Sequence, residues 1–248
     1  MNLLSRLMDL IYPPRCGVCH AFLQEDAVNH EGEEMDLCRR CFNSFVETTS
    51  PLCPSCGRPF GSGGGEDHTC ADCLAARPSF DIARSPYIYE GLLMTAIHEL
   101  KYARKTSLAR SLGPLLASYA ARWLGNPVEK LLVMPVPLHP RRLRQRGFNQ
   151  SLLLARHVAS RLEADLDCFS LRRTRFTQPQ TNLTSDERKK NVRRAFGVVE
   201  TSSLKGRAVL LIDDVATTGS TLNECARVLK KTGVKEVSCL VLARTATH

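Results

Sequence analysis

The stretch RAVLLIDDVATTGSTLNE, residues 207–224, decides the fold. An apolar run ends in two adjacent carboxylates, Asp213 and Asp214, and a short turn leads from them into a segment with helical spacing. Unbroken apolar runs of this kind are typical of strands buried on both faces of a parallel sheet. Ligands of such sheets bind beyond the carboxyl ends of the strands. The stretch therefore predicts a strand, turn and helix that hold a ligand at the turn.

The turn suits a phosphate, and the carboxylates suit its neighbour. Backbone N–H groups of residues 216–220 converge where the helix begins, and Gly219 allows close approach of the backbone. The turn also offers four hydroxyl groups, those of Thr217, Thr218, Ser220 and Thr221. The two acids would repel a phosphate but accept hydrogen bonds from ribose hydroxyls and face Mg²⁺. A sugar 5′-phosphate satisfies both halves, whereas a helix cap explains one hydroxyl and neither acid.

The rest of the chain after residue 80 alternates between strands and helices. We expect strands at 84–91, 130–138, 209–214 and 236–243, and helices at 92–103, 107–124, 147–162 and 218–233. The helix at 107–124 is expected to be kinked or divided at Gly113-Pro114. This alternation predicts an α/β fold with a Rossmann-like parallel sheet over residues 81–248. A Walker B reading of the two acids fails because the chain has no GxxxxGK[ST] loop.

Eight of the eleven cysteines form four C-x-x-C pairs before residue 75. The pairs are Cys16/Cys19, Cys38/Cys41, Cys53/Cys56 and Cys70/Cys73. Two such pairs complete a tetrahedral four-thiolate zinc site, and such closed sites are structural. We expect consecutive pairs to share an ion in a small zinc-ribbon domain over residues 1–80, although spacing alone also permits interleaving. A c-type haem motif, CGVCH, is present but leaves three pairs unexplained.

Positive charge is concentrated in one segment. The chain has a net charge of +9, and residues 139–194 alone hold 14 Lys/Arg against 5 Asp/Glu. Residues 1–80 hold 6 against 11. Such a block indicates a polyanionic partner, either nucleic acid or a phosphorylated small molecule. Single-stranded DNA fits the charge, but few aromatic side chains are present to stack on bases.

The N-terminal residues carry no export signal in this interpretation. Residues 1–14 read as a short amphipathic helix ended by Pro13 and Pro14, with no small-residue cleavage site. No apolar run reaches the roughly 18–20 residues of a membrane span. We therefore expect a cytoplasmic protein without a membrane span.

Several stretches together resemble a known family. VLLIDDVATTGST (209–221) resembles the loop of type I phosphoribosyltransferases that binds 5-phosphoribosyl-1-pyrophosphate (PRPP). LKY (100–102), PVPLHPRRLRQRGFNQ (135–150), QTNLTSDERKKNVRRAF (180–196) and the cysteine pairs extend the match to the ComF/GntX family. The resemblance implies a type I phosphoribosyltransferase fold with a double zinc ribbon. It also implies a part in natural competence, with single-stranded DNA and DNA-uptake proteins as partners.

The resemblance assigns roles to particular residues. It implies that Asp213 and Asp214 hold the ribose hydroxyls of PRPP, with Mg²⁺, and that 177–196 is a flexible lid. The 5′-phosphate would lie on Ala216, Thr217, Thr218, Gly219, Ser220 and Thr221. The pyrophosphate would lie near Val136 and Pro137, with further contacts from Arg141, Arg142, Arg144 and Arg146.

Catalysis is left open by the sequence. Residue 2 is asparagine, where glutamine amidophosphoribosyltransferases use a cysteine, so we expect no such activity. A phosphoribosyltransferase also needs a group that selects its acceptor. His98 and Lys101 lie one helical turn apart in the expected hood, residues 81–125, and either face a ligand or form a surface pair. Both an enzyme with an unidentified acceptor and a binding protein without turnover fit the sequence.

Overall fold

The computed structural model describes residues 12–23, 36–61, 64–125, 130–177, 184–199 and 203–246. The amphipathic helix expected in residues 1–14 lies almost wholly outside the described residues, as do residues 178–183 of the expected lid. Within the described part, no helix is long and apolar enough to cross a bilayer.

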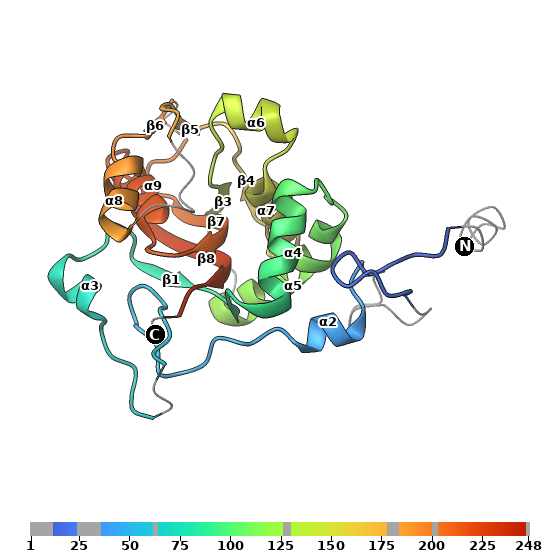
Figure 1. Cartoon of the computed structure of the whole chain (residues 1–248). Helices are drawn as coiled ribbons and strands as arrows, with labels where there is room; N and C mark the ends of the chain where they lie inside the picture. The colour runs from blue at the N-terminus through green and yellow to red at the C-terminus, as the bar shows by residue number, and fades with distance from the viewer. Residues whose placement is uncertain are drawn as a thin grey trace.

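A six-stranded parallel sheet forms the centre of the protein (Figure 1). Its strands are β1 (Ile82–Arg84), β2 (Tyr87–Ile88), β3 (Leu131–Pro135), β4 (Asp165–Leu166), β7 (Ala208–Ala216) and β8 (Glu236–Arg244). The order is β1-β8-β7-β3-β4, and β2 also pairs with β8. The central strand β7 is buried along almost its whole length. This arrangement confirms the predicted α/β fold.

Helices cover both faces of the sheet (Figure 1). One face carries α4 (Gly91–Tyr102), α5 (Leu108–Leu124) and α7 (Gln150–Arg161). The other carries α9 (Ser220–Lys230), α8 (Ser185–Val192) and a two-stranded antiparallel sheet of β5 (Leu171–Arg173) and β6 (Phe196–Val198). Side chains alternate along a strand. Leu210 and Ile212 of β7 therefore join the core beneath α4, α5 and α7, while Val209 and Leu211 join the core beneath α9.

The two cysteine-rich segments pack on opposite faces. The first ribbon (described residues 12–23 and 36–44, with α2, Arg39–Asn43) contacts the α4–α5 side, where the Asp36 N–H donates to Ser111 Oγ at 2.8 Å. The second ribbon (described residues 52–61 and 64–75, with α3, Ala71–Ala75) joins the core on the α9 side. It also borders the sheet, because the Ala83 N–H donates to the carbonyl of Ser55 at 2.9 Å. Each ribbon therefore supports a different core.

Three segments differ from the sequence expectation. The helix at 108–124 is not divided, and Pro114 lies inside it. Part of the expected lid is helical: Thr184 and Glu187 form a capping box that starts α8. A further helix, α6 (Pro140–Arg146), follows β3, because proline at its first position and the His139 side chain, which accepts from the Arg141 N–H, both favour a helix start.

Gly113 allows α5 and α7 to approach closely. A Cβ at this position would lie 2.2 Å from the His157 ring of α7. We expect Gly113→Ala to lower the free energy of unfolding by about 1–3 kcal/mol through overpacking, despite the better helix propensity of alanine. Urea unfolding measures the change. Adding His157→Ala should recover most of the lost stability. A double variant that is no more stable than Gly113→Ala alone would show that the clash with His157 is not the cause.

Candidate ligand-binding site

A cleft of about 990 Å³ opens at the carboxyl ends of β7 and β3, beneath α4. It brings together many of the residues predicted from the sequence. Asp213, Asp214, Thr217, Thr221, Val136, Pro137, Arg142 and Arg146 all line it. His98 and Lys101, for which the sequence left open a ligand contact or a surface pair, also line it. Arg141 and Arg144 do not line it and instead lie exposed on α6.

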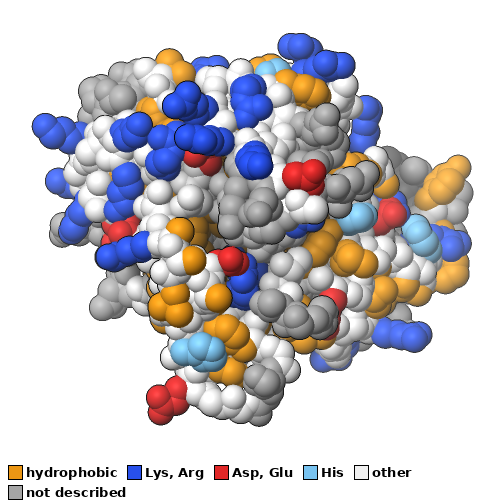
Figure 2. All heavy atoms as spheres, turned by 60° about the vertical axis from the view of Figure 1, so that its left-hand side comes forward, with side chains coloured by type: hydrophobic (Ala, Val, Ile, Leu, Met, Phe, Trp, Pro, Cys, Tyr) orange, Lys and Arg blue, Asp and Glu red, His pale blue; other side chains and the backbone are white. Residues whose placement is uncertain are grey.

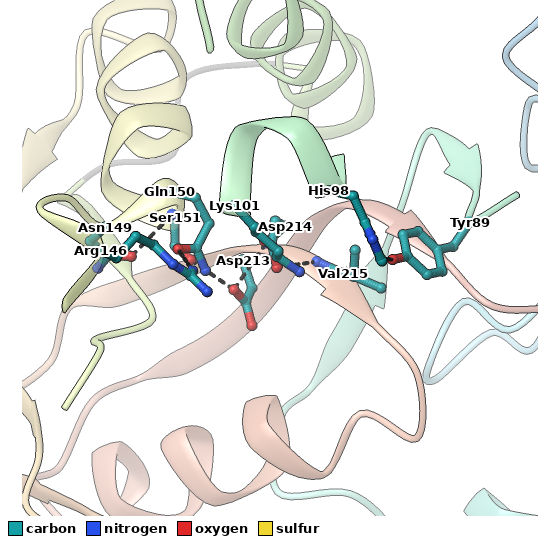
Figure 3. Close-up of polar contacts among 10 residues, drawn as sticks. All are labelled: Tyr89, His98, Lys101, Arg146, Asn149, Gln150, Ser151, Asp213, Asp214 and Val215. Atoms are coloured by element: carbon teal, nitrogen blue, oxygen red, sulfur yellow. Dashed lines mark hydrogen bonds and ion pairs between the residues drawn. The ribbon is translucent and has the colours of Figure 1, made fainter. Parts of the chain in front are cut away.

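The two aspartates lie near the carboxyl end of β7, and their surroundings differ (Figure 3). Asp213 Oδ1 accepts a hydrogen bond from Ser151 Oγ of α7 at 2.7 Å. Asp214 Oδ2 lies 2.7 Å from Lys101 Nζ, which reaches down from α4. The side chains of Lys101 and Asp214 are only 16% and 5% exposed, so this is a buried ion pair. The aspartates therefore tie the central strand to two helices of one face.

Burial controls the charge of Asp213. It raises the pKa of this carboxyl to about 7, and the neighbouring charge of Asp214 adds to the rise, while the Ser151 hydrogen bond opposes it. Burial acts to lower the pKa of Lys101, but the charge of Asp214 outweighs it, so the pKa of Lys101 is raised. The ammonium of Lys101 thus stays charged, whereas Asp213 is close to half-protonated at neutral pH.

The shift at Asp213 predicts a pH dependence of stability. Between its unfolded pKa near 4 and its folded pKa of about 7, the folded protein binds a proton that the unfolded chain has lost. The contribution of Asp213 to the unfolding free energy should therefore fall as pH rises through this window, by at most about 1.4 kcal/mol per pH unit. Urea unfolding from pH 5 to 8 tests this. Asp213→Asn should flatten the profile, and parallel profiles would disprove the assignment.

The turn after β7 leads into an open helix N-terminus. Gly219, with φ +73°, is the N-cap of α9 and so provides no side-chain cap. Thr218 Oγ1 and Ser220 Oγ lie 2.7 Å apart within the turn. Thr217 and Thr221 line the cleft, whereas Ala216, Thr218, Gly219 and Ser220 do not. Backbone N–H groups and hydroxyls at a helix N-terminus suit an anion.

Several arginines also line the cleft. Arg142 of α6 donates to the carbonyl of Thr177 at 2.9 Å, and Arg188 of α8 also lines the space. Arg173 of β5 is buried, and its Nη2 donates to Thr177 Oγ1 at 2.6 Å. Burial lowers the pKa of Arg173, and the charge of Arg142 adds to this effect. The cleft therefore holds both carboxylates and guanidinium groups.

A basic surface borders the cleft. Figure 2 shows Lys and Arg side chains gathered over the upper part of one face. Its exposed members lie on α6, β5, α8 and the adjoining turns: Arg141, Arg144, Arg172, Arg175, Lys190, Arg193 and Arg194. Phe176 is exposed among them, and the Arg141 guanidinium lies 4.8 Å from the centre of its ring. The surface thus combines positive charge with an exposed aromatic ring.

The cysteines form two tetrads of consecutive pairs, as predicted. Within each tetrad all four Sγ atoms lie within 4.8 Å of one another. The Sγ–Sγ distances of 3.7 Å for Cys16–Cys41 and 3.7 Å for Cys56–Cys70 match the edge of roughly 3.8 Å in a tetrahedron with Zn–S bonds of about 2.3 Å. The tetrads therefore fit zinc without rearrangement. This pairing excludes the interleaved alternative.

Three groups at the site were not singled out from the sequence. Ser151 follows the Asn149 cap of α7, Arg173 lies in a short strand, and Tyr89 hydrogen-bonds His98 at 2.9 Å between its Oη and the ring Nε2 (Figure 3). None lies in a motif with a recognisable spacing. They reach the cleft only because segments far apart in the sequence pack together.

Comparison with known proteins covers nearly the whole chain. The double zinc ribbon domain matches residues 7–74, and the phosphoribosyl transferase domain matches residues 149–247. DNA utilization protein YhgH of Salmonella typhi is 34% identical over 95% of this chain and 99% of its own length. Competence protein F of Haemophilus influenzae is 32% identical over 84% of this chain and 88% of its own length. Competence protein ComFC of Bacillus subtilis is 26% identical over 84% of each chain.

Proposed function

The chain belongs to the ComF/GntX family, and on that premise we propose that it binds PRPP with Mg²⁺ in the cleft at the end of β7. One observation carries the proposal: two buried carboxylates adjoin an open helix N-terminus inside a cleft lined by arginines. Ribose hydroxyls suit the carboxylates, and a 5′-phosphate suits the helix N-terminus. The zinc ribbons of residues 1–80 then serve as a scaffold for the ligand-binding domain of residues 81–248.

Each wall of the cleft takes one part of this ligand. Asp213 and Asp214 accept from the ribose hydroxyls, and residues 216–221 surround the 5′-phosphate. Val136 and Pro137, held to α7 by the Asn149 amide, which donates to the Val136 carbonyl at 3.1 Å, lie where the pyrophosphate fits. Arg142 and Arg173 supply positive charge to it. Mg²⁺ bound with PRPP supplies further neutralisation of the pyrophosphate charge.

The protein takes part in DNA uptake and the handling of single-stranded DNA. Curated relatives carry the names competence protein and DNA utilization protein. The basic surface beside the cleft supports this role, because clustered Lys and Arg attract a phosphate backbone. Exposed Phe176 offers a ring on which a base can stack. We place this work in the cytoplasm, where the tetrad thiols stay reduced.

A second candidate is an active phosphoribosyltransferase. An acceptor nitrogen would attack the anomeric carbon of PRPP while the bond to pyrophosphate breaks, and pyrophosphate leaves. The arginines stabilise the leaving group, and a closed cleft excludes water. His98, which lines the cleft and is fixed by Tyr89, is the side chain placed to meet an acceptor. Release of pyrophosphate that depends on an added nitrogen base would favour this enzyme over a binding protein.

Thermal unfolding with ligands tests the proposed binding. PRPP and Mg²⁺ at about 100 times the dissociation constant should stabilise the protein by about 2.7 kcal/mol. Ribose 5-phosphate should stabilise it less, because it lacks the pyrophosphate. Inorganic pyrophosphate with Mg²⁺ controls for charge alone. An unchanged melting temperature with PRPP at millimolar concentration would contradict the proposal.

Salt-dependent DNA binding tests the basic surface. A fluorescent oligonucleotide should bind, and its affinity should fall steeply with salt. The double variant R141E/R144E should weaken binding by more than tenfold and flatten the salt dependence. Its matched control is R39E/R40E, which changes two exposed arginines of α2 in the first ribbon. Equal losses in both variants would assign the effect to net charge and contradict a specific DNA surface.

A further inference from the structure

Arg244 is a buried arginine that the proposed ligand contacts do not use. It ends β8, in register with Ala216 of β7 and Ile88 of β2. Its side chain is among the largest fully buried ones, with the residue 1% exposed. Among the described residues, its Nε and Nη1 have no hydrogen-bond partner. A buried cation without partners is costly, so a structure that retains one places an anion near it.

The guanidinium lies between the phosphate loop and the second ribbon. On one side, a Cβ built on Gly219 would lie 3.9 Å from both Nη1 and Nη2, so the guanidinium faces the glycine that caps α9. On the other side, Cys56, Cys70 and Cys73 of the second ribbon attract it when they are thiolates, while the charge of Arg58 repels it. A zinc ion with four thiolates has a net charge of about −2. Arg244 thus lies near both the second cysteine tetrad and the turn before α9.

The second ribbon packs on the side of the sheet that holds Ala216, the residue in register with Arg244. The ribbon joins the same core as β8 and α9, and the guanidinium is left without solvent or hydrogen-bond acceptors on two of its nitrogens. A phosphate bound at the turn would place a negative charge near the Arg244 guanidinium, on the side that faces Gly219. Such a phosphate therefore lowers the cost of holding the ribbon against the sheet.

We propose that Arg244 couples the second zinc site to phosphate binding at the turn before α9. This inference rests on the proposed function, because it assumes a phosphate at that turn. Binding of the phosphate favours the docked, zinc-loaded ribbon. By reciprocity, the docked ribbon raises the affinity for the phosphate. Arg244 acts through the backbone of Gly219 and is a positioning residue.

Pulsed alkylation of the zinc-loaded protein tests the coupling cysteine by cysteine. Mass spectrometry follows each tetrad with and without ribose 5-phosphate. We expect the ligand to slow modification of the second tetrad at least threefold more than that of the first. Arg244→Met should remove this selective protection and weaken ribose 5-phosphate about tenfold in calorimetry, the size expected for one nearby charge at a partly buried site. Arg244→Lys, which keeps the charge, should retain part of both effects.

Arg58→Met is the matched control. Arg58 is another cation beside Cys56 and Cys70, but it pairs with Asp72 at 2.7 Å. Its loss should leave ligand affinity and selective protection unchanged. Wild-type protein that binds ribose 5-phosphate without selective protection of the second tetrad overturns the coupling alone, even if no Arg244 variant folds. Wild-type protein that does not bind the ligand at all overturns the proposed function and the coupling together.

Discussion

Asp214→Asn should lower the free energy of unfolding by about 3 kcal/mol and reduce PRPP binding below detection. The reason is the buried ion pair between Asp214 and Lys101, whose N–O distance is 2.7 Å. Removing one partner leaves the other as an uncompensated buried charge. The same change replaces one oxygen that would accept from a ribose hydroxyl with a donor. Urea unfolding and calorimetry with PRPP and Mg²⁺ measure the two losses separately.

A double variant separates stability from recognition. Lys101→Met combined with Asp214→Asn removes both charges, so it should recover most of the lost stability. It should not recover PRPP binding, because the ligand would still lack its acceptor. Recovery of both properties would show that Asp214 serves only to hold α4 over the sheet. Failure to recover stability would show that the loss does not arise from an unpaired Lys101.

The ion pair also bears on how a ligand enters. In this structure Lys101 Nζ lies 2.7 Å from Asp214 Oδ2 (Figure 3), and both residues line the cleft. In the proposed binding mode, a ribose hydroxyl would share this carboxylate with the ammonium or displace it. Asp213 bonds Ser151 instead and is close to half-protonated at neutral pH. We therefore expect PRPP binding, if it occurs as proposed, to depend on the position of α4 and on pH.

The fold was largely predictable because its signals are local. The apolar run before Asp213 and the spacing of the cysteine pairs each depend on adjacent residues, and both the parallel sheet and the two tetrads are confirmed. The helix α8 was missed because its polar sequence has no apolar face to indicate helical periodicity. Its Thr184–Glu187 capping box was the available signal.

The site was less predictable because it is assembled across the chain. The sequence placed Lys101 one turn from His98 and left open whether this pair meets a ligand or the surface. Only the packing of α4 over β7 brings Lys101 to Asp214. Arg173 and Arg244 lie at strand positions that read as ordinary sheet residues. Their burial depends on elements distant in sequence, so no local pattern indicates it.

Loss of either zinc ion should destabilise the protein, and the two losses should loosen opposite faces. Cys38 and Cys70 are matched positions, since each is the third ligand of its tetrad and the N-cap of a short helix. We expect Cys38→Ser and Cys70→Ser each to release one zinc ion. Structural zinc sites contribute folding energy outright, so each change should cost about 5 kcal/mol or more. Metal analysis and thermal unfolding measure these changes.

Hydrogen exchange should distinguish the two variants. The first ribbon packs on α5, and Lys105, between α4 and α5, donates from Nζ to the Gly17 carbonyl at 3.1 Å. Cys38→Ser should therefore speed exchange in α4 and α5. The second ribbon bonds the edge of the sheet at Ala83, so Cys70→Ser should speed exchange in β1 and α9. A uniform rise across both faces in each variant would show that the ribbons stabilise one cooperative unit. Confined changes would show that each zinc ion supports its own side of the ligand cleft: the hood above it in the first case, and the turn before α9 in the second.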